Sequence, residues 1–210
     1  MCFDWQSSLT SWAISTGASW YLYKRNKNYD RWNAGFITCF STIQLLEAGI
    51  WKTDPSKGVT ENNELLSKLI LVGLSAQPLV QTYSAYVFTQ ESVLWYATWV
   101  FVGFLIYSIW RILKAKPGDF YSTVGSKGHL VWHSKKGEKG KEGVFGSWSG
   151  VLYLLGIFIP LFFMKDYGGL PLMAIGILTA AYVLYIAGPG EFGSMWCYTA
   201  IFYSVVALVM

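Results

Sequence analysis

Four polar side chains fall inside two long apolar stretches of this 210-residue sequence, and their types allow chemistry that an apolar helix does not need. They are Glu47, Gln44, Gln77 and Gln81. A carboxylate inside a membrane span costs on the order of 2 to 3 kcal/mol on insertion scales, so it needs a partner, a proton or a watery cavity. We interpret the four residues as a candidate site for a proton, another ion or a small polar solute.

The first of these stretches is residues 32–51, WNAGFITCFSTIQLLEAGIW. At a rise of ~1.5 Å per residue, Trp32 and Trp51 lie ~28 Å apart, so each indole can rest at a membrane interface. A turn of ~100° per residue gathers the polar groups on one side, with Glu47 at the edge of that stripe. This side is predicted to face the interior of a helix bundle. The alternative is that Glu47, four residues before Trp51, reaches a lipid headgroup or pairs with a lysine.

The second stretch, residues 64–88, places Gln77 and Gln81 on one stripe with Pro78 between them. A proline inside a helix removes a hydrogen bond and frees the carbonyl of the residue four positions earlier. Membranes tolerate this where neighbouring groups or water satisfy the carbonyl. We therefore predict a helix kinked at Pro78 that lines the same interior cavity as Glu47, near the middle of the bilayer.

The histidines, His129 and His133, are weak candidates for a metal site. Their spacing would let them share a zinc ion in a helix, but four residues of a strand span ~13 Å, which is too far for one ion. Alternation about the GSKG turn favours a strand. We expect no metal here, and a hairpin whose Leu130 and Trp132 touch the membrane or the mouth of the bundle.

Other enzymatic chemistry finds little support in the sequence. Residues 194–210 contain no lysine for a retinal Schiff base, and no glycine-rich phosphate loop occurs. A serine hydrolase would need a histidine embedded near its serine. The sequence therefore disfavours an enzyme and predicts no cofactor.

Composition indicates that the solvent of this chain is lipid. Its residues are 53% hydrophobic, 18% aromatic and 13% charged, against roughly 25% charged in soluble domains. The net charge of +4 comes from basic residues clustered in loops, which indicates a membrane surface and not a nucleic-acid partner. Two of the three cysteines lie in predicted spans, so no disulfide framework is expected. The sequence predicts an integral, multi-pass membrane protein whose partner is the lipid bilayer.

The predicted fold class is all-α and transmembrane, a seven-helix bundle with a small β-hairpin in the long loop between the fourth and fifth helices. The chain forms one integral membrane domain, residues 1–210, whose extramembrane part is 114–146. The predicted spans are 5–23, 32–51, 64–88, 92–113, 147–164, 169–188 and 194–210. Within the loop, 120–133 should form the hairpin and 135–143 should remain mobile.

The first span is predicted to be a packing helix. Ser7, Ser11, Ser15 and Ser19 recur at every fourth position, a pattern of small residues that lets helix backbones approach closely in lipid.

Charge counts predict the orientation of the bundle. If the spans alternate, the side that holds the N-terminus carries ten lysines and arginines, with Lys68 as an eleventh, and the other side carries five. The positive-inside rule then favours a cytoplasmic N-terminus and a cytoplasmic hairpin. The basic turn at 23–31 argues for the opposite orientation.

Several short segments carry a resemblance to known proteins: YDRWNAGF, IQLLEAGIW, QPLVQ, HLVWH and FGSMWC. Together they resemble a group of uncharacterised seven-helix membrane proteins encoded by large DNA viruses of algae and protists. The resemblance implies this fold and a host or viral membrane, and it implies no activity. A second likeness is to the three-plus-one-plus-three architecture of PQ-loop and sugar-exporter proteins. In this sequence the order is Gln77-Pro78, the reverse of that motif.

Two hypotheses for the function follow. The first is a transporter, channel-like or ligand-sensing bundle that uses the four buried polar residues as an interior site. The alternative is a structural or interaction protein of a viral or host membrane that uses the 114–146 loop as a contact surface. An anchor does not need a polar lining, so the polar lining favours the first hypothesis.

Overall fold

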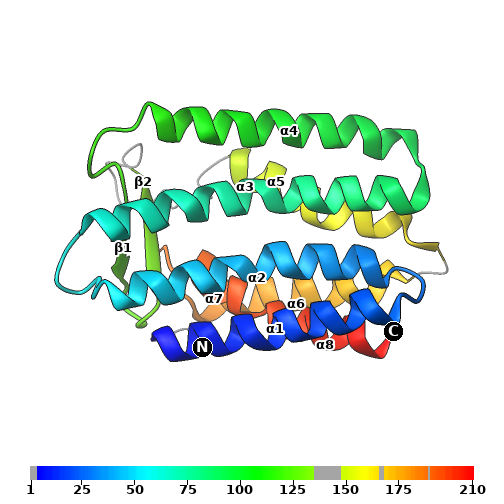
Figure 1. Cartoon of the computed structure of the whole chain (residues 1–210), viewed down its shortest axis with the longest axis horizontal. Helices are drawn as coiled ribbons and strands as arrows, with labels where there is room; N and C mark the ends of the chain where they lie inside the picture. Colours follow the sequence, from blue (N-terminus) through cyan, green and yellow to red (C-terminus); the bar gives the residue numbers. More distant parts are fainter. Residues whose placement is uncertain (1–3, 135–147, 166–167, 189) are drawn as a thin grey trace.

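Helices make up most of the chain in the computed structural model, which describes residues 4–134, 148–165, 168–188 and 190–210. They lie side by side along one common direction (Figure 1). In chain order they are α1 (Trp5–Arg25), α2 (Asp30–Lys52), α3 (Glu61–Thr89), α4 (Ser92–Leu113), α5 (Trp148–Phe158) with the 3-10 helix η1 (Ile159–Phe163), α6 (Gly169–Ile186), and α7 (Phe192–Tyr198) with α8 (Ala200–Val209). Counting α7 and α8 as one interrupted helix, the predicted seven-helix architecture is confirmed.

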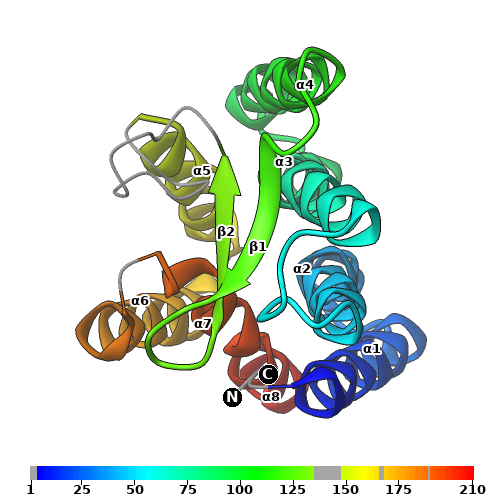
Figure 2. The same ribbon diagram turned by 90° about the vertical axis from the view of Figure 1, so that its left-hand side faces the viewer.

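The helices are arranged as a ring when the bundle is viewed along its axis (Figure 2). Helix α1 packs on α2, α2 packs on α3, and α8 returns to contact both α1 and α2. Helix α4 packs against α3 on the outside of the ring. The inner faces of α2, α3, α5 and the α7–α8 pair therefore meet in the centre of the molecule.

Five helical stretches are long and apolar enough to cross a membrane. They are α2, α3, α4, α6 and the stretch Phe192–Val209 that contains α7 and α8. Helix α1 is not among them, although its 21 residues are long enough, because serines dilute its apolar content. Trp148–Phe163 is apolar but shorter. The chain is thus a multi-pass helical membrane protein with five clear spans.

Local sequence explains where several helices begin and end. Asp4 accepts a hydrogen bond from the Ser7 backbone and forms a capping box that starts α1, and Asn26 ends the helix in a left-handed conformation. Thr60 caps the start of α3, because its side chain accepts from the Asn63 backbone. It runs without a break through Pro78 to Thr89. The predicted kink at Pro78 stays a prediction.

The serines of α1 pack as expected of a close-contact helix. Ser11, Ser15 and Ser19 are buried, and Ser19 Oγ donates to the Ala34 carbonyl of α2 at 2.7 Å. Ser7 instead belongs to the capping box at the start of the helix.

The predicted hairpin is confirmed, with strands β1 (Phe120–Val124) and β2 (Leu130–Ser134) in antiparallel register. It lies across one end of the bundle, which we call the hairpin end (Figure 2). Leu130 and Trp132 are buried there, so the hairpin covers the mouth of the bundle. The segment 135–143, predicted to be mobile, lies outside the described residues.

Candidate functional site

All four predicted site residues are wholly buried. Glu47, Gln44, Gln77 and Gln81 each have a relative exposure of 0%. A side chain that reached a lipid headgroup would be exposed at the surface of the protein, so the burial of Glu47 does not fit that alternative. The polar sides of α2 and α3 both face the interior of the bundle.

Gln81 joins three helical segments through its amide. Its Oε1 accepts from Trp32 Nε1 of α2 at 2.9 Å, and its Nε2 donates to the Ile157 carbonyl of α5 at 3.2 Å. Trp32 is itself fully buried, so its indole faces the interior of the bundle and not the surrounding lipid. The amide of Gln81 supplies the acceptor that a buried indole N–H requires.

Gln77, one turn before Gln81 on α3, contacts the fifth helix. The hydroxyl of Tyr153 donates to Gln77 Oε1. Among the described parts of the chain, Gln77 Nε2 has no hydrogen-bond partner. Buried polar groups are nearly always satisfied by protein or by water, so this amide is a donor that a water molecule or a passing polar solute can use.

The pairing of α2 with α3 spreads the four residues along the bundle. Ile43 lies against Gly73, where an added Cβ would be 2.7 Å from the isoleucine Cδ1. The two helices run in opposite directions (Figure 1), so Glu47 lies ~6 Å to one side of this contact and Gln77 ~6 Å to the other. Glu47 and Gln77 are thus ~12 Å apart along the axis, with Gln44 between them. Glu47, Gln44, Gln77 and Gln81 therefore lie in a row along the bundle axis, which we call the polar file. Their convergence on one cavity stays a prediction.

A hollow at the end of the bundle opposite the hairpin leads toward this file. Its volume is about 550 Å³, and Lys27, Asp30, Asn33 and Lys165 are among its lining residues. We call this hollow the pit. The carboxylate of Asp30 is held by Arg25 at 2.7 Å.

Asn33 connects the pit to the glutamines. Its side chain is 2% exposed, and its Oδ1 accepts from the Tyr203 hydroxyl at 3.2 Å. The same hydroxyl interacts with Gln81. Polar side chains therefore continue from the pit through Asn33 and Tyr203 to Gln81.

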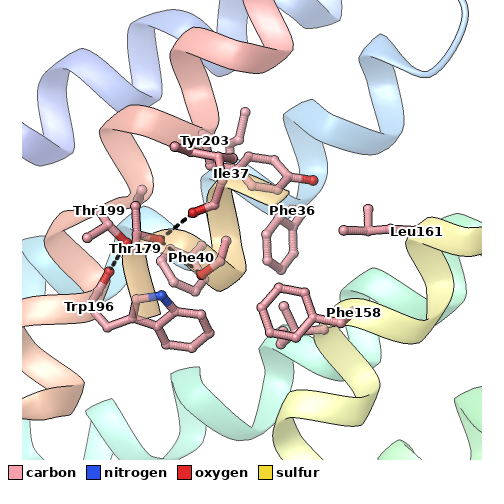
Figure 3. Close-up of a pocket in the computed structure, with 13 residues that line it drawn as sticks. Phe36, Ile37, Phe40, Phe158, Leu161, Thr179, Trp196, Thr199 and Tyr203 are labelled. Atoms are coloured by element: carbon pink, nitrogen blue, oxygen red, sulfur yellow. Dashed lines mark hydrogen bonds between the residues drawn. The ribbon is translucent and has the colours of Figure 1, made fainter. Parts of the chain in front are cut away.

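Beside this polar file lies a small apolar cavity of about 30 Å³, which we call the inner cavity (Figure 3). Phe36, Phe40, Phe158 and Trp196 are among its lining residues, and the Tyr203 ring also borders it. The aromatic rings contact one another, with Phe40 and Trp196 centroids 5.7 Å apart. The interior next to the file is thus filled by aromatic packing.

The hairpin end is held shut by Glu191, a residue that sequence reasoning missed. Its side chain is fully buried and accepts hydrogen bonds from the backbone N–H groups of Lys127 at 2.9 Å and His129 at 3.2 Å. It also accepts from Ser126 Oγ at 3.2 Å. Glu191 immediately precedes α7, so it ties the hairpin turn to the start of the last span. The only signal in the sequence is an acid within the glycine-rich segment GPGEFG.

Asn63 holds the other strand of the hairpin. Its side-chain amide donates to the Ser122 carbonyl and accepts from the Ser122 N–H, both at 2.9 Å. It thus forms the same pair of backbone hydrogen bonds that a residue of a neighbouring antiparallel strand would form. Ser67 Oγ lies 2.7 Å from Ser122 Oγ. Trp132 covers Gly193 so closely that a Cβ there would lie 2.6 Å from the indole. The hairpin is therefore attached to both α3 and α7.

The two histidines have separate structural roles in the hairpin. His133 Nε2 lies 2.8 Å from Thr123 Oγ1, and its ring stacks on Tyr121 at 4.5 Å. His129 is buried beside Glu191. Burial lowers the pKa of both imidazoles, so both favour the neutral form. No group of three or more His, Cys, Asp or Glu side chains in the described ranges is placed to hold a metal ion.

Comparisons with known proteins found no matching protein-family model, no matching curated protein and no matching solved structure. The sequence and the structure therefore carry the functional argument alone. They make this chain a multi-pass helical membrane protein with polar residues buried along its centre.

Proposed function

We propose that the chain transports or conducts a small polar species, a proton foremost, along the polar file between α2 and α3. The observation that carries this proposal is the complete burial of Glu47, Gln44, Gln77 and Gln81 on two neighbouring spans. Each such group is costly inside a membrane, and apolar side chains would pack these helices without that cost.

The proposed route begins at the pit. It passes Asn33 and Tyr203, reaches Gln81 and then Gln77, and continues past Gln44 to Glu47. The unpaired Nε2 of Gln77 supports a polar species at that level. The hairpin covers the far end, so in this proposal the route is open toward the pit and closed at the hairpin end.

Glu47 is the proposed proton-binding group of the route. It is the residue of the file whose charge changes when it gains or loses a proton, whereas glutamine, asparagine and tyrosine can only relay hydrogen bonds at neutral pH. A proton gained from the pit side and released at the hairpin end would complete transfer. Release requires the hairpin end to open.

Flux measurements on vesicles test this proposal. Purified protein is reconstituted with an internal pH-sensitive dye, and a pH gradient is imposed with valinomycin and potassium to balance charge. We expect proton entry faster than in protein-free vesicles, and we expect Glu47→Gln to return it to the protein-free rate. The substitution keeps the shape of the side chain and removes its titratable group.

A matched control uses an acid away from the file. Glu91 is exposed at the junction of α3 and α4, so Glu91→Gln should leave flux unchanged. Flux in the wild type equal to that of empty vesicles would contradict proton conduction. Flux that survives Glu47→Gln would contradict the role of Glu47.

A further inference from the structure

A groove on the outside of the bundle, between α6 and the α7–α8 pair, is separate from the polar file. Its volume is about 410 Å³. The side chains that line it are aliphatic, aromatic, threonine or methionine, so the lining is uncharged. Leu178, Tyr182 and Phe202 at its mouth are 65%, 61% and 50% exposed. Both walls belong to candidate spans, so the groove opens into hydrocarbon.

The groove reaches toward the inner cavity behind it. Ile175, Thr179 and Thr199 line both spaces, so these three side chains form the partition between them. Thr179 Oγ1 donates to the Ile175 carbonyl at 2.7 Å, and Thr199 Oγ1 donates to the Trp196 carbonyl at 2.5 Å. Both threonine hydroxyl groups donate to a carbonyl of their own helix (Figure 3). Neither hydroxyl hydrogen is therefore directed into the groove or the inner cavity.

The break in the last span contributes to this opening. Thr199 lies between α7 and α8, at the point where the helix is interrupted. On the opposite wall, Gly176 leaves room for the ring of Phe158, since a Cβ there would lie 2.6 Å from the ring. Two local features of the backbone therefore bring the lipid-facing groove close to the aromatic centre of the bundle.

We infer that this groove is a binding site for one acyl chain of a bilayer phospholipid. The chain lies along the hairpin-end half of α6, where residues 175–186 provide ~17 Å of apolar wall. Its end contacts the partition formed by Ile175, Thr179 and Thr199. The lining contains no lysine or arginine that could pair with a carboxylate or a phosphate, so the headgroup stays at the membrane interface.

Packing, and not transfer from water, holds the chain. Lipid hydrocarbon is as apolar as the groove, so no hydrophobic gain drives binding inside a membrane. A concave surface surrounds a chain with more atoms than disordered lipid does, and an unfilled hollow would lose those dispersion contacts. Binding of this kind depends on the shape of the groove, so a side chain that fills the groove should displace the lipid.

Photo-crosslinking tests the inference. The full-length protein is reconstituted in phosphatidylcholine vesicles that contain a phosphatidylcholine with a diazirine in the distal half of one chain. After irradiation, mass spectrometry maps the adducts. We expect them to concentrate on residues of the groove, and excess unlabelled phosphatidylcholine to reduce them. Adducts spread evenly over the exposed faces of α4 and α6 would overturn the inference.

Two variants of α6 form a matched pair. Ile175 lines the groove, whereas Ile177 is 50% exposed and belongs to neither wall of the groove nor the inner cavity. We expect Ile175→Phe to lower the groove adducts about fivefold or more because the ring fills the space, and Ile177→Phe to leave them unchanged. Equal yields from the two variants would overturn the site.

A second groove variant keeps the inference testable if the first variant misfolds. If Ile175→Phe does not give a monodisperse helical protein, Phe202→Trp on the opposite wall should lower the adducts in the same way, and unchanged adducts there would overturn the site. A free fatty acid that competes better than phosphatidylcholine would overturn the assignment to a phospholipid chain.

Discussion

The buried polar residues fall into two groups, which differ in how their polar atoms are engaged. Gln81, Trp32 and Asn33 have their hydrogen-bonding groups engaged with other helices, so they fix how the helices meet. Among the described residues, Gln77 Nε2 has no hydrogen-bond partner, and Glu47 is a buried titratable group at the end of the file nearer the hairpin. The first group stabilises the contacts between helices, and the second contains the groups on which the proposed transport depends.

Glu191 is the residue whose loss should most affect the hairpin. Its carboxylate accepts from two backbone N–H groups and one hydroxyl in a buried place. Hydrogen bonds to a charged acceptor contribute roughly 1.5 to 3 kcal/mol, and a glutamine at this position would turn one donor toward other donors. We expect Glu191→Gln to lower the free energy of unfolding by about 1 to 3 kcal/mol.

Hydrogen exchange measures this effect locally. The amides of Lys127 and His129 should exchange faster in Glu191→Gln than in the wild type, and the thermal midpoint in detergent should fall. The control is Glu61→Gln, an exposed acid in the first turn of α3, which should change both quantities little. Unchanged exchange at the hairpin turn would show that other contacts hold it.

At the scale of elements, close approach between α5 and its neighbours depends on a glycine. An added Cβ at Gly156 would lie 2.3 Å from the Phe101 ring of α4 and 2.5 Å from Pro78 Cβ of α3. The proline atom is fixed to the backbone and cannot move aside as a flexible side chain can. This contact gives Pro78 a packing role that does not depend on any kink.

Gly156→Ala should therefore force α5 away from α3 and α4, at a cost of about 1 to 3 kcal/mol in the free energy of unfolding. Gly103 of α4 provides the control, because a Cβ there meets nothing within 4 Å. Gly103→Ala should leave the stability in detergent unchanged or raise it, since alanine favours helix. Equal thermal midpoints for the two variants would show that the bundle accommodates the extra methyl group at Gly156.

At the scale of the whole molecule, the orientation in the membrane follows from the two ends of the bundle. Among the described residues, the hairpin end carries Lys52, Lys57, Lys114, Lys116 and Lys127, with Lys68 and Arg111 nearby on α3 and α4, and the pit end carries Lys24, Arg25, Lys27, Arg31 and Lys165. The positive-inside rule favours a cytoplasmic hairpin end and a pit that opens on the other side. In that orientation, a proton on the proposed route would enter from the non-cytoplasmic side.

Cysteine labelling in intact cells tests this orientation. In a Cys2→Ser background, Val59→Cys places a thiol in the exposed loop at the hairpin end, and Glu91→Cys places one at the pit end. An impermeant maleimide should label Glu91→Cys from outside and should label Val59→Cys only after the cells are opened. The reverse pattern would reverse the orientation.

The sequence by itself determined the class of the protein, the number of helices and the place of the hairpin. These depend on local quantities, namely the length of apolar runs, the position of turns and the alternation of side chains, and each can be read within a few residues. It also indicated that the polar sides of α2 and α3 face inward, because the cost of exposing them to lipid does not depend on the partner helices.

Only the tertiary structure decided which groups meet. Trp32 had the spacing of an interfacial residue and turned inward to Gln81, 49 positions away, because the amide lay within reach. The hairpin was predicted correctly, but its attachment through Asn63 and Glu191 joins segments 59 to 65 positions apart. The axial offset of Glu47 from Gln77 follows from the packing of Ile43 on Gly73. Side-chain patterns within one helix cannot specify these distances, because helix register is set by the shapes of both partners.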